Sequence, residues 1–223
     1  MKMNKGVLFI VSAASATGKD TVVSEVIRKS AGNAVLSVSM TTRQPRGEEQ
    51  EGVHYFYVSE EAFKNNISNG LMLEYAKYGR YYYGTPLEPV EKWLNEGKTV
   101  FLIIEVQGAA IVREKMPGAR SIFILPPSLD ILEKRLRGRN SDTEDSILRR
   151  MTIARDEIAR AGEYDYIIVN DDLETAVEEF SSLCRYEKCV LNGMPVQEAD
   201  VIVADKSRKN KMMNTVSEVL KND

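Results

Sequence analysis

The sequence has little of what metal clusters, disulfide frameworks and membrane spans require. It contains one histidine and two cysteines in 223 residues. Cys184 and Cys189 lack the CxxC spacing of a zinc site, so both are expected to be ordinary reduced thiols. The apolar run after Lys2 and Lys5 is too short for a signal peptide, and no run reaches the length of a membrane span. These absences predict a cytoplasmic protein with no membrane partner.

An excess of positive charge is also absent. The chain has 30 lysine and arginine residues against 33 acidic ones, a formal net charge of -3. Proteins that bind nucleic acid generally need a basic excess to displace counterions from phosphates, so nucleic acid is not expected as a partner. Hydrophobic content of 43% and charged content of 28% are ordinary for a globular enzyme. The length fits one α/β domain with one or two insertions.

Residues 7–22, VLFIVSAASATGKDTV, form an apolar run that ends abruptly in small residues and Gly18-Lys19. This order predicts a buried strand, a phosphate-binding loop and the first turn of a helix. In such a loop the backbone N–H groups and the helix N-terminus face the phosphates, and a lysine reaches the outer ones. The predicted nucleotide-binding residues are Ala13, Ala14, Ser15, Ala16, Thr17, Gly18, Lys19, Asp20 and Thr21.

The loop departs from the GxxxxGK[ST] pattern at Ala13 and Asp20, and Ala16 also stands where many such loops carry a further glycine. Ala13 replaces the first glycine, Ala16 stands where a positive φ is often required, and Asp20 replaces the hydroxyl residue that normally holds Mg²⁺. Asp20 can be a replacement metal ligand, a charge favoured by the helix dipole, or a sign of lost activity. An ordinary strand-to-helix turn that contains Gly-Lys is the alternative to a phosphate site.

Strand-like and helix-like segments alternate along most of the chain. The strands are expected at 35–39, 99–105, 121–125 and 166–169, with helices between them, which predicts a parallel sheet covered by helices on both faces. Residues 40–86 begin as a polar loop and continue as aromatic, strand-like sequence, so they are expected to be a β-rich insertion. In the tail, residues 201–204 are expected to form a short strand. The tail is a dimer contact, a flap over the nucleotide site or a loose end.

Six further stretches occur in a specific order: SVSMTTRQPRGEEQEGVHYF, EYAKYGRYYYGT, IEVQGA, LPPS, RLRGRNSDTED and IVNDD. Together with the loop at 13–21 they resemble the guanylate kinase family over about residues 6–188. Members of this family transfer a phosphoryl group from ATP to GMP or dGMP. The resemblance implies a three-layer P-loop fold with core segments 1–39 and 87–190, a GMP-binding insertion at 40–86, a helical lid at about 137–150 and an extension at 191–223.

The resemblance also implies how the acceptor nucleotide is held. Arginine forks and phenol hydroxyls suit a phosphate dianion, and a carboxylate can accept hydrogen bonds from guanine N1–H and its exocyclic amine. Glu74 matches that base-reading carboxylate. The other implied GMP-binding residues are Ser39, Arg43, Arg46, Tyr55, Tyr83, Gly84, Thr85 and Glu105.

Four cations match the family positions that act on the transferring phosphoryl group: Lys19, Arg135, Arg139 and Arg150. Fixed cations help because charge spreads over that group in the transition state. Asn170 and Asp171 fall where the family places a turn beside the adenine of ATP. Mg²⁺ is the implied cofactor, with Asp20 and Glu105 as ligands, directly or through water.

Two departures keep alternatives open. Ile103 stands where relatives commonly carry a carboxylate, and His54 replaces a frequent aspartate. One alternative is a kinase for another nucleoside monophosphate. The other is a non-catalytic GMP-binding module, which the retained lysine and arginines disfavour. Apart from the nucleotides, the sequence suggests only a homodimer contact as a further interaction.

Overall fold

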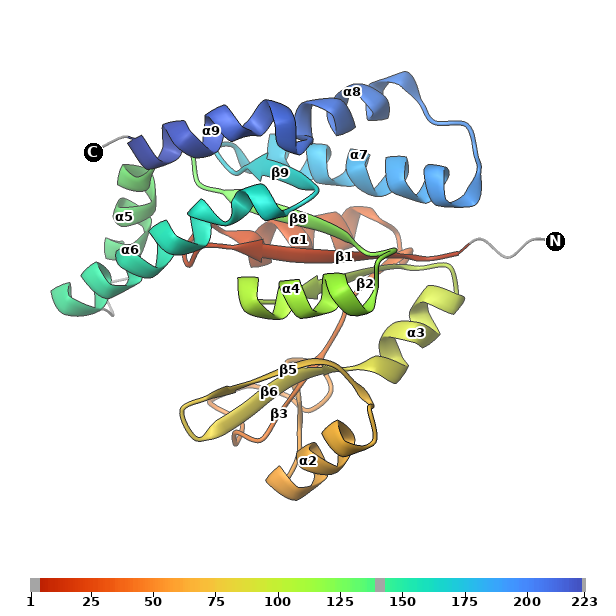
Figure 1. Ribbon diagram of the computed structural model, residues 1–223, viewed down its shortest axis with the longest axis vertical. Coiled ribbons are helices and arrows are strands. Elements are labelled where there is room, and N and C mark those ends of the chain that lie inside the picture. Colours follow the sequence, from red (N-terminus) through yellow and green to blue (C-terminus); the bar gives the residue numbers. More distant parts are fainter. Residues whose placement is uncertain (1–4, 139–142, 222–223) are drawn as a thin grey trace.

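A five-stranded parallel sheet forms the centre of the molecule (Figure 1). The computed structural model describes residues 5–138 and 143–221, without the side chains of residues 209–214. The strand order is β2-β7-β1-β8-β9, so β1 lies in the middle. The strands are β1 (Val7–Ala13), β2 (Ala34–Leu36), β7 (Thr99–Ile103), β8 (Arg120–Leu125) and β9 (Tyr166–Val169).

Helices cover both faces of this sheet because the side chains of β1 alternate between two apolar clusters. Phe9 packs with helices α1 (Lys19–Lys29) and α7 (Leu173–Asn192) on one face. Ile10 belongs to the cluster on the other face. That cluster draws on α3 (Leu87–Asn95), α4 (Val106–Lys115), α5 (Leu129–Arg137) and α6 (Glu144–Ala159). The predicted three-layer α/β fold is confirmed.

A second, four-stranded sheet lies to one side of the parallel sheet and carries its own helix (Figure 1). Its order is β4-β3-β6-β5, with one parallel pair and two antiparallel pairs. The elements are β3 (Ser39–Thr41), β4 (Tyr55–Tyr57), α2 (Glu60–Ser68), β5 (Met72–Tyr78) and β6 (Tyr81–Pro86). Ser59 caps α2 by accepting from the Ala62 N–H, as its sequence position predicts.

Two predicted strands have the wrong bounds. The strand expected at 35–39 is two strands, because β2 ends at Leu36 and the chain crosses to the second sheet, where β3 begins at Ser39. The strand expected at 99–105 ends at Ile103, and Glu105 is instead the N-cap residue of α4. Both errors arise because extended backbone continues past the last ladder hydrogen bond.

The C-terminal segment is helical, so the strand expected at 201–204 is wrong. It forms α8 (Glu198–Ser207) and α9 (Lys209–Lys221). Asp200 is buried and accepts hydrogen bonds from Ser182 and Arg185 of α7, which fixes the first turn of α8. Ala204 joins the α1–α7 cluster, and Val216 of α9 joins the opposite one. The tail is part of the core and not a loose end.

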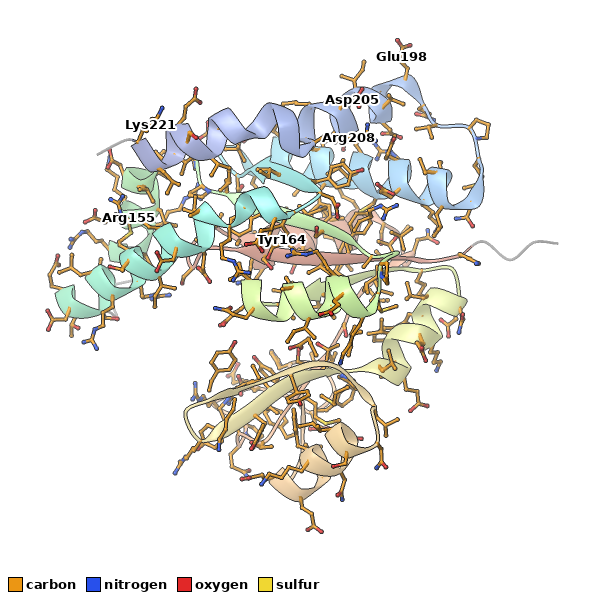
Figure 2. All side chains as sticks on the ribbon, in the orientation of Figure 1. Arg155, Tyr164, Glu198, Asp205, Arg208 and Lys221 are labelled. Carbon is orange, nitrogen blue, oxygen red and sulfur yellow. The ribbon has the colours of Figure 1, made fainter. Side chains whose placement is uncertain are left out.

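Arg208 lies at the junction of α8 and α9, facing α7 (Figure 2). Its Nη2 donates to the Tyr186 hydroxyl at 2.6 Å and its Nη1 to Asp205 Oδ1 at 2.8 Å. The Arg208 backbone also forms an antiparallel bridge with Tyr166 of β9. These contacts set the angle between the two helices and direct α9 toward α6.

We expect Val219→Ala to lower the free energy of unfolding by about 2 kcal/mol. Val219 is a residue of α9 that is 2% exposed and packs in the core cluster with α6. Val201→Ala on α8 is the matched control, because Val201 is 37% exposed and its truncation should change the free energy by less than about 0.5 kcal/mol. Urea denaturation measures both. Equal effects in the two variants would show that α9 does not pack as described.

Both cysteines are free thiols, as predicted, and burial raises the pKa of Cys184. Across the described ranges, no helix is long and apolar enough to cross a membrane.

Candidate active site

The loop between β1 and α1 contains two residues with a positive φ. Gly18 has φ 90° and is the N-cap residue of α1, which begins at Lys19. Ala16 has φ 67°, so the positive φ expected at this position is confirmed. A residue with a Cβ loses roughly 1–2 kcal/mol in this conformation, and the surrounding contacts must offset that cost.

Those contacts converge on the Thr17 carbonyl. Asn170 Nδ2 donates to it at 2.7 Å and Arg135 Nη1 at 3.2 Å, while Arg135 Nη2 donates to the Asn170 carbonyl at 3.1 Å. A Cβ on Gly18 would lie 2.7 Å from Asn170 Nδ2, so glycine is required there for this packing. Arg135 and Asn170, predicted from the resemblance as a lid cation and an adenine neighbour, lie against the loop backbone and support its shape.

A cavity opens in front of this loop. Ala13, Ser15, Lys19 and Asp20 line one side of it, and Arg150 and Glu157 of α6 line another. Arg150 Nη2 donates to Ser15 Oγ at 2.5 Å, and Lys19 Nζ lies 3.4 Å from Asp20 Oδ2. The structure therefore brings Arg150 to the neighbouring residues Lys19 and Asp20, from which it is far apart in the sequence.

Glu157 is a residue of this cavity that the sequence analysis missed. Burial, together with the nearby charge of Glu105, raises the pKa of Glu157 to about 7. Its spacing from Arg150 is the one available signal. The two residues are seven positions apart on α6, which places them on one helix face.

A second cavity lies between the four-stranded sheet and α4. Its lining includes Ser39, Tyr55, Glu74, Tyr78, Tyr83, Gly84 and Gly108. Four residues line both this cavity and the one in front of the loop: Tyr55, Ile103, Ile104 and Glu105. The two spaces therefore adjoin at Glu105, at the end of β7 where α4 begins.

Glu74 is buried in the wall of the second cavity. The Thr85 hydroxyl donates to Glu74 Oε1 at 2.7 Å and so orients the carboxylate. Burial raises the pKa of Glu74, against the lowering effect of the Thr85 hydrogen bond. Gly84 pairs with Tyr75 of β5, and a Cβ at Gly84 would lie 2.5 Å from the Glu74 carbonyl oxygen. Glycine is thus required for the close approach of β5 and β6 beside Glu74.

The buried guanidinium of Arg43 is held by Glu49, which the sequence analysis missed. Arg43 Nη1 and Nη2 donate to the two carboxylate oxygens of Glu49 at 2.8 and 2.9 Å. Glu49 also accepts from the Arg46 N–H at 2.8 Å and the Tyr57 hydroxyl at 2.9 Å. The hydrogen bonds from Arg43, followed by that from the Arg46 backbone, lower the pKa of Glu49 to about 2.

Several other predicted site residues do not line either cavity. The side chains of Thr21, Arg46 and Asp171 are exposed. Arg139 lies outside the described residues. His54 is exposed, and its Nδ1 accepts from the Gln50 N–H at 3.0 Å, which is a turn contact.

Comparisons with known proteins agree on one family. A sequence model described as guanylate kinase matches residues 5–187. A guanylate kinase of Pasteurella multocida is 48% identical over 202 residues, covering 90% of this chain and 97% of that protein. A guanylate kinase of Mannheimia succiniciproducens is 49% identical over 191 residues, covering 85% of this chain and 92% of that protein.

A solved structure gives the same result. The crystal structure of guanylate kinase from Anaplasma phagocytophilum superposes with a TM-score of 0.66 at 34% identity, covering 83% of this chain and 87% of that one. The family match spans the P-loop, the four-stranded sheet and α6, so it includes both cavities. The chain therefore belongs to the guanylate kinase family.

Proposed function

We propose that the chain transfers the γ-phosphoryl group of ATP to GMP or dGMP, with ATP on the loop at 13–21 and the acceptor in the cavity beside Glu74. Membership of the guanylate kinase family supplies the reaction. The observation that carries the arrangement is that the two cavities adjoin at Glu105. Two bound nucleotides would thereby present their phosphates to each other without leaving the protein.

Glu74 would recognise the guanine base. Its ionised carboxylate accepts two hydrogen bonds, and guanine offers two adjacent donors at N1 and the exocyclic amine. Adenine presents an acceptor at N1 and would be repelled. Because Thr85 already donates to one Glu74 oxygen, the carboxylate is oriented before the base arrives. Such preorganisation reduces the entropy lost on binding.

Arg43 would hold the acceptor phosphate. A guanidinium has five N–H donors, and the Arg43 contacts with Gln44 and Glu49 use three of them. Tyr83 and Tyr55 also interact with this guanidinium, so a phosphate dianion would share its remaining donors with these two phenols. Arg43 lies behind Tyr55, with its guanidinium carbon 5.3 Å from the centre of that ring. Tyr55 and Tyr83 line the cavity beside Glu74, with their ring centroids 6.0 Å apart, and would add phenol hydroxyls. Glu49 then acts as the group that orients Arg43.

Lys19 and Arg150 would stabilise the charge that develops on the transferring phosphoryl group. Both line the loop cavity, and the Arg150 contact with Ser15 keeps the α6 cation close to the phosphate-binding backbone. Phosphoryl transfer depends mainly on alignment and charge neutralisation, so the protein can promote it with positioned cations and needs no proton-transfer residue. Arg135 supports the loop backbone, and a second role in the closed lid stays a prediction.

The residues present fit a Mg²⁺ ion that arrives with ATP. Mg²⁺ usually keeps several waters and takes one or two protein carboxylates plus substrate phosphates. Asp20 and Glu105 line the same cavity, and the described residues hold no cluster of three or more metal-ligating side chains. Asp20 and Glu105 would hold the ion, which would neutralise phosphate charge.

We expect Asp20→Ala and Glu105→Ala each to raise the Mg²⁺ concentration that gives half-maximal activity by about tenfold or more, because each removes a carboxylate near the ion. Titrating Mg²⁺ at fixed ATP and GMP measures this. Asp130→Ala on α5 is the control, since Asp130 is exposed outside both cavities. An unchanged Mg²⁺ requirement in both site variants would exclude these two ligands.

One acceptor series tests the function itself. Initial rates with ATP and each of GMP, dGMP, IMP, AMP, UMP and CMP should show turnover for GMP and dGMP above all others. Higher turnover with another monophosphate would establish a different acceptor. This alternative is specific because Ile103 stands where relatives commonly carry a carboxylate. Binding of GMP without turnover of any acceptor would establish a binding module.

A further inference from the structure

Tyr78 makes a contact that links the two sheets across the acceptor cavity. It is the last residue of β5, directly before the turn at Gly79 (φ 60°). Its hydroxyl donates to Glu105 Oε2 at 2.5 Å. Glu105 belongs to the core, as the N-cap residue of α4, so this hydrogen bond joins the tip of the β5–β6 hairpin to the core.

The opposite end of β5 is also held on the core. Lys115 Nζ of α4 donates to the Met72 carbonyl at 3.3 Å, at the first residue of β5. Glu74 lies between these two attachments, in the wall of the cavity. The strand that carries the base-reading carboxylate is therefore fastened to α4 at one end and to Glu105 at the other.

Glu105 lines one cavity together with Glu74 and the other together with Glu157. Burial raises the pKa of Glu74, and the charge of Glu105 adds to that effect. Burial likewise raises the pKa of Glu157, with the Glu105 charge as the next cause. Like charges favour rotation of the Glu105 side chain away from the junction of the two cavities. A phenol hydroxyl that donates to it opposes that rotation.

The Tyr78 ring also contacts the acceptor-phosphate side of the cavity. It meets the Tyr83 ring edge to face, with 5.8 Å between centroids, and Tyr83 in turn meets Tyr55 at 6.0 Å. Tyr78 is 45% exposed, so ring burial contributes little, and its hydroxyl carries the main interaction. The hydroxyl can therefore act on the site through Glu105.

We infer that Tyr78 is a positioning residue for phosphoryl transfer: its hydroxyl holds the Glu105 carboxylate at the junction of the two cavities and ties the hairpin tip to the core. This inference rests on the proposed function, because it assigns Glu105 to the junction between ATP and GMP. It deepens that function by adding a tyrosine for which the resemblance implied no role.

Hydrogen exchange without nucleotide tests the tie directly. In Tyr78→Phe, amides of residues 76–82 should exchange faster than in the wild type, since the hairpin tip loses its attachment. Tyr81→Phe is the matched control, because Tyr81 pairs with Tyr78 across the same turn. Equal exchange in wild type and Tyr78→Phe would overturn the inference. This experiment needs no substrate, so it tests whether the Tyr78–Glu105 hydrogen bond holds the hairpin even if GMP is not the acceptor.

Kinetics test the positioning role. Tyr78→Phe should lower kcat/KM for GMP by about tenfold, the lower end for a hydrogen bond to a charged group, with little change in KM for ATP. In a Glu105→Gln background the same substitution should change kcat/KM by less than about twofold, because its partner is already altered. A decrease of about tenfold in kcat/KM in both backgrounds, or no decrease in either, would overturn the positioning role. Absence of wild-type turnover with GMP would contradict the proposed function instead.

Discussion

In the Glu74→Gln variant we expect kcat/KM for GMP to fall by about a thousandfold, because the amide keeps one acceptor oxygen but turns an N–H donor toward the second guanine donor. Glu74 is 6% exposed, so water cannot replace the lost acceptor. The preference for GMP over AMP should narrow as well, since an amide N–H can donate to adenine N1. Initial rates with both acceptors at saturating ATP measure both effects.

A stability measurement separates this effect from damage to the fold. Burial raises the pKa of Glu74, so its folded state binds the proton more tightly than its unfolded state. The stability that this contributes is present at low pH and is lost as the pH rises through the raised pKa. At pH 7 a neutral glutamine avoids that loss, so Glu74→Gln should unfold at a temperature equal to or above that of wild type. A marked decrease would assign Glu74 a structural role.

In Arg43→Lys we expect kcat/KM for GMP to fall by about a hundredfold while KM for ATP stays unchanged. Lysine keeps the charge but loses the planar fork that serves Glu49 and the acceptor phosphate at the same time. One Glu49 oxygen loses its charged donor, and the pKa of Glu49 should rise from about 2 toward its ordinary value. Steady-state rates with GMP and ATP varied separately measure the kinetic effect.

Two further variants complete this experiment. Arg28→Lys on α1 is the control, because Arg28 pairs with Glu25 on an exposed helix face. Glu49→Gln should produce a smaller loss in the same parameter, since Arg43 keeps its fork and loses only the group that orients it. A wild-type kcat/KM in Arg43→Lys would exclude Arg43 as the acceptor-phosphate ligand.

Local patterns predicted the parts of this protein that depend on neighbouring residues. The apolar strand, small-residue loop and Gly18-Lys19 are contiguous, so β1, the positive φ at Ala16 and the start of α1 follow from adjacent side chains. Ser59 and Ser128 likewise mark helix starts, because serine is a preferred N-cap residue, and the side chain of each accepts a capping hydrogen bond. The roles of the site residues stay predictions, although eleven of these residues line the two adjoining cavities.

Patterns failed where a distant segment decides the backbone. Residues 201–204, VIVA, are apolar and the first three are β-branched, which favours a strand. They form a helix because α7 holds Asp200 through Ser182 and Arg185 and buries Ala204. The sequence also contains no signal for the break between Leu36 and Ser39. The backbone is extended on both sides of the break, and only the partner strand changes.

The sequence by itself determined the family, the α/β order and the identity of the phosphate-binding loop, because each depends on residue type at short spacing. The tertiary structure alone decided which charged groups meet. It paired Arg43 with Glu49, set Tyr78 on Glu105, placed Glu157 beside the loop and fastened the Thr17 carbonyl with Asn170 and Arg135. These contacts join segments that the chain separates, and a hydrogen bond depends on the distance and angle between its atoms in the folded protein.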